Sequence, residues 1–291
     1  MSLSPFTVDE NTFLKQNINL PPLSRTLLQV LEVIHSRISG AAEVAELVSR
    51  DAAMATHILK VVNSAYYCLP TRIANIQHAI AYLGLAQVSH ICLTLSVINT
   101  LKPGDRAELQ YFWLHSYYTA LIARNLSKEF KNIPDAGELY SAALLHDIGQ
   151  LVYQRFYPDH FHEMRHFCSQ KGTFLTDAEE QFGFASHLTF GSLLADHWAL
   201  PQSIKRACSF HELRDLRSIQ DTSNGESFDI IITVSNMLAA LARANLHENL
   251  KEEITAEVRR VLNMSKDQFL AFLGSLYDLE RKAEASITRL V

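Results

Sequence analysis

The sequence contains few residues that break regular structure, with 10 glycines and 8 prolines among 291 residues, about half of the share in an average chain. Because such residues mark turns, we expect long helices rather than a meander of short strands. Only four cysteines are present, widely spaced and without a C-x-x-C pair, which is typical of reduced core residues. No uninterrupted apolar run approaches the roughly 18 residues that a membrane-spanning helix needs.

The chain also lacks a large charge of either sign, since its formal net charge is -5. No overall field therefore attracts nucleic acid or an anionic lipid surface, and we expect neither nucleic-acid nor membrane partners. The first residues, Met1–Phe6, lack the basic start and apolar run of a signal peptide, so we expect a cytoplasmic protein. A hydrophobic share of 48% with 20% charged residues excludes a disordered chain.

Apolar residues recur at the 3.6-residue period of an α-helix, and no strand-like alternation is long enough to predict a sheet. We therefore predict an all-α fold. The predicted helices cover residues 23–39, 41–48, 51–65, 76–83, 85–101, 109–131, 137–156, 160–170, 175–182, 186–198, 202–211, 228–245, 251–262 and 266–288. A polar loop is predicted at 218–225. The helix breaker at Lys102–Asp105 predicts an N-terminal helical subdomain over 1–104, packed on a second helical subdomain over 105–291.

Histidine is the unusual component, with 13 residues, of which four occupy apolar helical faces. His115, His187 and His211 each continue a row of apolar residues at helical spacing, and His146 lies in an apolar segment that predicts a buried helix. A single inward histidine is usually a hydrogen-bonded core residue. Four of them, one followed directly by Asp147, favour a site for a divalent transition metal, because imidazole and carboxylate are its ligands.

Two neighbouring features support a metal site. Gly149 allows close approach to the backbone beside His146-Asp147. His187 falls in the first turn of its predicted helix, where the helix dipole favours the neutral imidazole that can bind metal.

The segment Leu145-His146-Asp147-Ile148-Gly149, together with the three other histidines, resembles the HD superfamily of metal-dependent phosphohydrolases. Further motifs lie on both sides of it: Leu20-Pro21-Pro22-Leu23, Ala45–Asp51, Asn63-Ser64-Ala65-Tyr66-Tyr67, Ala79-Ile80 with Leu83-Gly84-Leu85, Gly183-Phe184 with Ser186-His187, and Trp198 with Leu200-Pro201. With these motifs the sequence resembles the narrower HDOD family of bacterial signalling proteins, which is related to the HD superfamily. This resemblance implies a multi-helix HDOD fold whose second subdomain is HD-like.

The resemblance also implies a set of metal ligands. They are His115, His146, Asp147, His187, His211 and, where the family carries a final aspartate, Asn236. The ion could be iron, manganese, zinc, nickel or magnesium. An asparagine supplies no charge, so we expect weaker divalent binding.

Two further positions differ from active relatives. Gln150 stands where cyclic-dinucleotide phosphodiesterases of the superfamily carry a lysine that meets developing phosphate charge, and their Gly-Tyr-Pro element is absent. Glu212 stands where a second histidine often follows in the family.

From this pattern we expect a regulatory, non-catalytic protein with a degenerate HD pocket, acting by binding a signalling partner or a small, nucleotide-type ligand. The alternative is a metal-dependent phosphohydrolase acting on nucleotides or cyclic dinucleotides, in which Asp147 would be the catalytic residue. The amphipathic C-terminal helix could cap the domain or form a homodimer contact.

Two other motifs are weaker. His162-Glu163-Met164-Arg165-His166 fits the H-E-x-x-H pattern of zinc proteases, but Arg165 places a charge inside it and we expect an exposed helix start. The helices over 41–48 and 51–65 resemble a helix-turn-helix, but their cations are balanced by acidic residues, which disfavours DNA binding.

Overall fold

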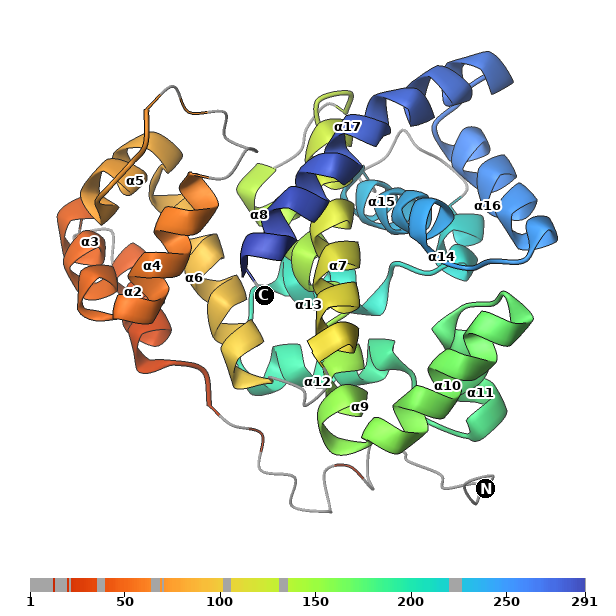
Figure 1. The fold of residues 1–291 in the computed structure, drawn as a ribbon, viewed down its shortest axis with the longest axis horizontal. Coiled ribbons are helices and arrows are strands. Elements are labelled where there is room, and N and C mark those ends of the chain that lie inside the picture. Colours follow the sequence, from red (N-terminus) through yellow and green to blue (C-terminus); the bar gives the residue numbers. More distant parts are fainter. Residues whose placement is uncertain are drawn as a thin grey trace. The chain divides into compact units, whose positions relative to one another are not determined.

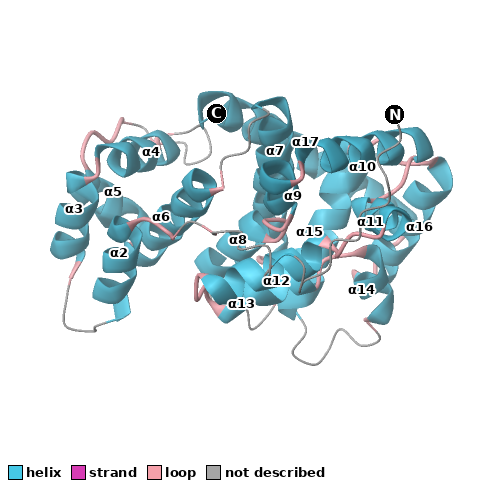
Figure 2. Ribbon diagram, turned by 90° about the horizontal axis from the view of Figure 1, so that it is seen from below, coloured by secondary structure: helices cyan, strands magenta, loops and turns pink. Residues whose placement is uncertain are grey.

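The computed structural model describes residues 13, 20, 22–35, 40–63, 69, 71–101, 106–130, 136–219 and 227–290. These residues form α-helices joined by turns and loops, without a β-strand (Figure 1 and Figure 2). The predicted all-α fold is confirmed. The helices are α2 (Arg25–His35), α3 (Ala41–Arg50), α4 (Ala52–Val62), α5 (Ile76–Leu83), α6 (Leu85–Thr100), α7 (Arg106–Leu126), α8 (Ala136–Leu145), α9 (Gln150–Phe156), α10 (Pro158–Lys171), α11 (Leu175–Phe182), α12 (His187–His197), α13 (Gln202–Ser209), α14 (Leu213–Ser218), α15 (Ser227–Arg243), α16 (Glu248–Val261) and α17 (Lys266–Leu290).

The helices divide into two compact units. The smaller unit contains α2 to α6 and the end of α17 from Glu280. The larger unit contains α7 to α16 and the part of α17 up to Leu279.

Capping side chains set the helix ends of the smaller unit. Asp51 accepts a hydrogen bond from the Met54 N–H at the start of α4. Asn63, just after α4, donates from its Nδ2 to the Leu59 and Ile73 carbonyls and accepts the Ile73 N–H on its Oδ1. A single side chain thus joins the end of α4 to the segment that leads into α5.

Helix α7 is central to the larger unit, because it packs against both α8 and α15. The contacts bury apolar residues of all three helices, including Leu121, Leu139 and Ile231. Helix α13 in turn packs against α8 and α12. This arrangement brings the segments that carry the four inward histidines close to one another.

The structure corrects several predicted helices; for example, the helix predicted over 109–131 is α7 and ends at Leu126. The predicted helix over 137–156 is broken, because α8 ends at Leu145 and residues 146–149 form a turn before α9. In this turn the Gln150 N–H bonds to the Asp147 carbonyl three residues back, which tightens the backbone. His211 lies beyond the end of α13 rather than inside a helix over 202–211. The short helix α14 was not predicted.

Some predictions fall outside the described residues: the breaker at 102–105, residues 64 and 65 at the end of the predicted helix over 51–65, and residues 220–225 of the predicted loop. In the described segments, no helix taken singly has both the length and the apolar composition to cross a bilayer; the sharply bent pair of α5 and part of α6 reaches them only when counted together.

Candidate metal centre

The six residues predicted from the sequence lie in one cluster around the Asp147 carboxylate. His146 and Asp147 come from the turn after α8, and His187 is the first residue of α12. The remaining three are His115 on α7, His211 after α13 and Asn236 on α15. The Asp147 oxygens lie 3.2 to 3.7 Å from the Nε2 atoms of all four histidines. The cluster is buried except for His115, which is half-buried.

Three of the imidazoles are held by their Nδ1 atoms. His146 Nδ1 donates to the Ala143 carbonyl and His211 Nδ1 donates to the Ala207 carbonyl, each at 2.7 Å. Because a carbonyl oxygen only accepts, the proton of the neutral ring is on Nδ1 and Nε2 carries a lone pair. His211 Nε2 shares a hydrogen bond with His187 Nε2 at 3.1 Å. His146 Nε2 is buried and has no hydrogen-bond partner. Free nitrogen lone pairs facing a carboxylate repel it unless a proton or a cation lies between them.

The third imidazole is held by Glu179, a buried carboxylate that the sequence analysis did not single out. Its Oε1 accepts both the backbone N–H and the Nδ1–H of His187, at 2.8 Å each. A carboxylate bonded to the far nitrogen of a histidine is a common support for a metal ligand. The available signal was the position of Glu179 on the apolar face of α11, with the buried Leu175 and Ala178.

The turn at residues 146–149 depends on Gly149. A Cβ atom at this position would lie 1.8 Å from the His187 carbonyl oxygen and 2.7 Å from the Gly191 nitrogen. The close approach expected from the sequence is therefore the backbone of α12. Only glycine lets the turn that carries Asp147 touch the helix that carries His187.

Asn236 is bonded within the protein at both ends of its amide. Its Nδ2 donates to the His211 carbonyl at 2.9 Å, which identifies Oδ1 as the atom that accepts from His115 Nε2 at 2.9 Å. In this arrangement His115 carries its proton on Nε2, the atom that faces Asp147.

Glu212, the third departure from the family pattern, points into the same cluster. Its Oε1 lies 3.3 Å from His187 Nε2 and 3.7 Å from His211 Nε2, and the residue is buried. The cluster therefore contains two carboxylates, Asp147 and Glu212, in contact with imidazole nitrogens.

Burial and charge act in opposite directions on these groups. Burial lowers the pKa of His115 to about 4, although Asp147 opposes the change. Burial also lowers the pKa of His187, but Glu179, Glu212 and Asp147 raise it well above its ordinary value. This direction is opposite to the one expected from the helix dipole alone. Burial raises the pKa of Asp147, yet the surrounding imidazoles hold it well below its usual range.

The donor set fits a divalent cation. Atoms that bind one ion at about 2.1 Å lie about 3.0 to 3.4 Å apart. The Nε2 atoms of His187 and His211 are 3.1 Å apart, and each lies within 3.4 Å of Asp147 Oδ1. Imidazole nitrogen and carboxylate oxygen together suit several first-row ions.

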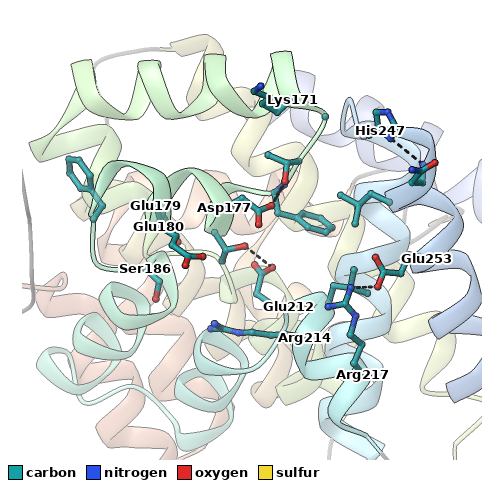
Figure 3. A pocket seen from close by; sticks show the side chains of 18 residues that line it. Lys171, Asp177, Glu179, Glu180, Ser186, Glu212, Arg214, Arg217, His247 and Glu253 are labelled. Carbon is teal, nitrogen blue, oxygen red and sulfur yellow. Dashed lines mark hydrogen bonds and ion pairs between the residues drawn. The ribbon is translucent and has the colours of Figure 1, made fainter. Parts of the chain in front are cut away.

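Two cavities meet at Glu212. The smaller one, about 80 Å³, is lined by Asp147, His187 and Asn236. The larger one, about 850 Å³, is also lined by Glu212 and is shown in Figure 3, together with Arg214 and Arg217. Glu212 Oε2 lies 3.5 Å from the Thr176 hydroxyl in the wall of this larger cavity.

The H-E-x-x-H motif belongs to a different surface. His162 and His166 on α10 are exposed, and His166 shares a hydrogen bond with Gln170. As expected, the motif lies on an exposed helix face.

Comparison with known proteins agrees with the resemblance seen in the sequence. The HDOD domain model matches residues 20–213. An uncharacterized protein of Treponema pallidum (strain Nichols) is 24% identical over 193 residues, which are 66% of this chain and 37% of that protein. This chain thus matches little more than a third of that relative's length.

Solved structures share the fold. An HDOD domain protein of unknown function from Geobacter sulfurreducens has a TM-score of 0.75 at 21% identity, covering 95% of this chain and 96% of its own. A candidate metal-dependent phosphohydrolase from Shewanella amazonensis SB2B has a TM-score of 0.66 at 20% identity, covering 95% of each chain. A candidate signal transduction protein from Marinobacter aquaeolei VT8 has a TM-score of 0.70 at 17% identity, covering 95% of this chain and 60% of its own. At these identities the likeness shows the fold alone. With the domain model matching two thirds of its length, this chain belongs to the HDOD family.

Proposed function

We propose that this chain is a regulatory HDOD protein whose degenerate HD pocket holds a divalent ion without catalysing hydrolysis. In this proposal the protein works in the cytoplasm and transmits a signal by binding a protein partner or a small, nucleotide-type ligand. The protein ligands of the ion come from the cluster around Asp147, for which the sequence predicts His115, His146, Asp147, His187, His211 and Asn236. The ion stabilises the buried charges of this cluster.

The observation that carries the proposal is the state of Asn236. The amide stands where a carboxylate ligand is expected, and both of its ends are bonded to protein atoms, His115 and the His211 carbonyl. A phosphohydrolase needs the charge of that carboxylate to hold its ion and activate a water molecule. Asn236 supplies neither that charge nor an unbonded ligand atom.

Two features of the smaller cavity support the same conclusion. Pockets that enclose small-molecule ligands have about 300 to 1,000 Å³, whereas this cavity has about 80 Å³. Among the described residues that line it, Arg165 is the one lysine or arginine. Its guanidinium lies over the Tyr111 ring at 4.3 Å and 3.7 Å from Glu108, so its charge is already paired.

The alternative is a working metal-dependent phosphohydrolase with Asp147 at its centre. It is supported by the His146-Asp147 cluster and by the name of the Shewanella amazonensis structure. The larger cavity, about 850 Å³, is wide enough for a nucleotide and reaches the cluster at Glu212.

Metal analysis combined with turnover assays separates the two functions. Protein purified without chelators is analysed by elemental mass spectrometry, and nucleotides and cyclic dinucleotides are tested as substrates. We expect about one divalent ion per chain and no turnover. The exposed His166→Ala variant serves as a control and keeps its ion. Turnover that disappears in His146→Ala would establish the hydrolase. Failure of the wild-type chain to bind any divalent ion would contradict the proposed metal pocket.

A further inference from the structure

The Asp147 carboxylate faces two separate groups of ligand atoms. Its Oδ2 lies 3.7 Å from His115 Nε2 and 3.4 Å from His146 Nε2. Its Oδ1 lies 3.4 Å from His187 Nε2 and 3.2 Å from His211 Nε2. An ion can therefore approach Asp147 from either side, and the two sides compete for it.

The Oδ2 side has few free donors. His115 Nε2 is occupied by its hydrogen bond to Asn236, and the Asn236 oxygen is occupied by the same bond. Only His146 Nε2 remains free there, beside one oxygen of Asp147. One nitrogen and one carboxylate oxygen make a poor site for a divalent ion, which takes four or more ligands.

The Oδ1 side has a fuller set, because Glu212 adds a second carboxylate. Glu212 Oε1 lies 3.3 Å from His187 Nε2 and 3.7 Å from His211 Nε2. The Nε2 atoms of these two histidines are 3.1 Å apart and share a hydrogen bond, so an ion that binds here displaces the proton between them. Their Nδ1 atoms are bonded to Glu179 and to the Ala207 carbonyl. Two nitrogens and two carboxylates from buried residues thus face one small volume, and the two carboxylate charges match a divalent ion.

We propose that the ion binds on the Oδ1 side of Asp147, with His187, His211 and Glu212 as its other protein ligands. His115 and Asn236 bind each other and remain outside the coordination. Two of the three departures from the family pattern then compensate, because the negative charge missing at Asn236 is supplied at Glu212. This inference rests on the proposed function only in requiring that the pocket binds an ion.

Metal titration of single-site variants tests the position of the ion. Metal-free protein is titrated with Mn²⁺ and the free ion is followed by electron paramagnetic resonance; Co²⁺ absorption gives a second readout that responds to the ligands. We expect Glu212→Gln to weaken binding at least tenfold and to change the Co²⁺ spectrum, because it removes a charged ligand and keeps the side-chain shape. Glu180→Gln, which changes an exposed carboxylate on α11, should change the affinity less than about threefold.

If Glu212→Gln leaves both the affinity and the Co²⁺ spectrum unchanged, the ion does not contact Glu212; the inference then fails while the metal pocket stands. If the wild-type chain binds neither ion, the metal pocket fails as well.

Asn236→Asp gives a second test that does not depend on the folding of the Glu212 variant. Adding a carboxylate beside His115 should create a second, weaker site or leave the first affinity unchanged. Tightening of the single existing site by tenfold or more would place the ion beside residue 236 and overturn the inference.

Discussion

Glu179 holds His187 through two hydrogen bonds to one carboxylate oxygen, from the backbone N–H and from the imidazole Nδ1–H, each at 2.8 Å. The pair joins α11 to the first residue of α12 and turns the Nε2 atom of His187 towards Asp147. A buried carboxylate with this contact orients a ligand without touching the ion itself.

Glu179→Gln should therefore weaken divalent binding about 10- to 100-fold, because an amide accepts the same bonds without the charge that favours them. The measurement is a Mn²⁺ titration of metal-free protein. Glu180→Gln is the matched control, since this neighbour is exposed on the same helix and should bind the ion as the wild type does. Equal affinities in both variants would refute the orienting role.

Gly149→Ala should lower the free energy of unfolding by about 3 kcal/mol or more, because the new Cβ would lie 1.8 Å from the His187 carbonyl oxygen. The variant should also lose metal, since the turn that carries Asp147 must move. Denaturant unfolding and elemental analysis measure the two effects.

Gly274→Ala is the control for that substitution. Gly274 lies on an exposed face of α17, and a Cβ added there would meet no atom within 4 Å, so alanine should raise the free energy of unfolding by about 0.5 to 1 kcal/mol. If Gly149→Ala and Gly274→Ala lowered the free energy of unfolding by similar amounts, the contact between Gly149 and the α12 backbone would not explain the effect.

Asn63→Ala should destabilise the smaller unit by about 2 to 3 kcal/mol, because three hydrogen bonds to Leu59 and Ile73 disappear together. Asn75→Ala, which removes the single bond that caps α5, should have the smaller effect of about 1 kcal/mol. Denaturant unfolding measures both variants. A larger loss of stability in Asn75→Ala than in Asn63→Ala would contradict the role given to the three Asn63 hydrogen bonds.

The buried cysteines should resist alkylation at any pH at which the protein is folded. Burial raises the pKa of Cys92 to about 12 and also raises the pKa of Cys208. A thiol reacts as its thiolate, so raising the pH to 9 should leave only about 0.1% of Cys92 reactive. Peptide mapping after iodoacetamide treatment, with and without guanidinium, makes the measurement. Rapid modification of Cys92 in folded protein at pH 8 would contradict the buried position of this thiol.

Local patterns predict much of this fold. The helices over 76–83 and 175–182 have the predicted ends, because Asn75 caps the first and glycines terminate both, at Gly84 and Gly183. These signals lie within a few residues of the ends that they determine, so the sequence alone contains them.

Features made by distant residues could not be predicted in the same way. The turn that interrupts the segment 137–156 depends on contact between Gly149 and the His187 backbone, which no local periodicity reports. The bond from His115 to Asn236 joins residues 121 positions apart. Both residues were in the predicted ligand set, yet the sequence does not indicate that they would bind each other.

Glu212 contacts His187 with one carboxylate oxygen and lies 3.5 Å from the Thr176 hydroxyl with the other. A small molecule seated against Thr176 and an ion held beside His187 would therefore share one side chain. If binding of the small molecule changes the affinity for the ion by some factor, the ion must change the affinity for the small molecule by the same factor, because the coupling of two binding sites is reciprocal. With both proposed sites filled, Glu212 would be the side chain through which the buried centre and the larger cavity affect each other.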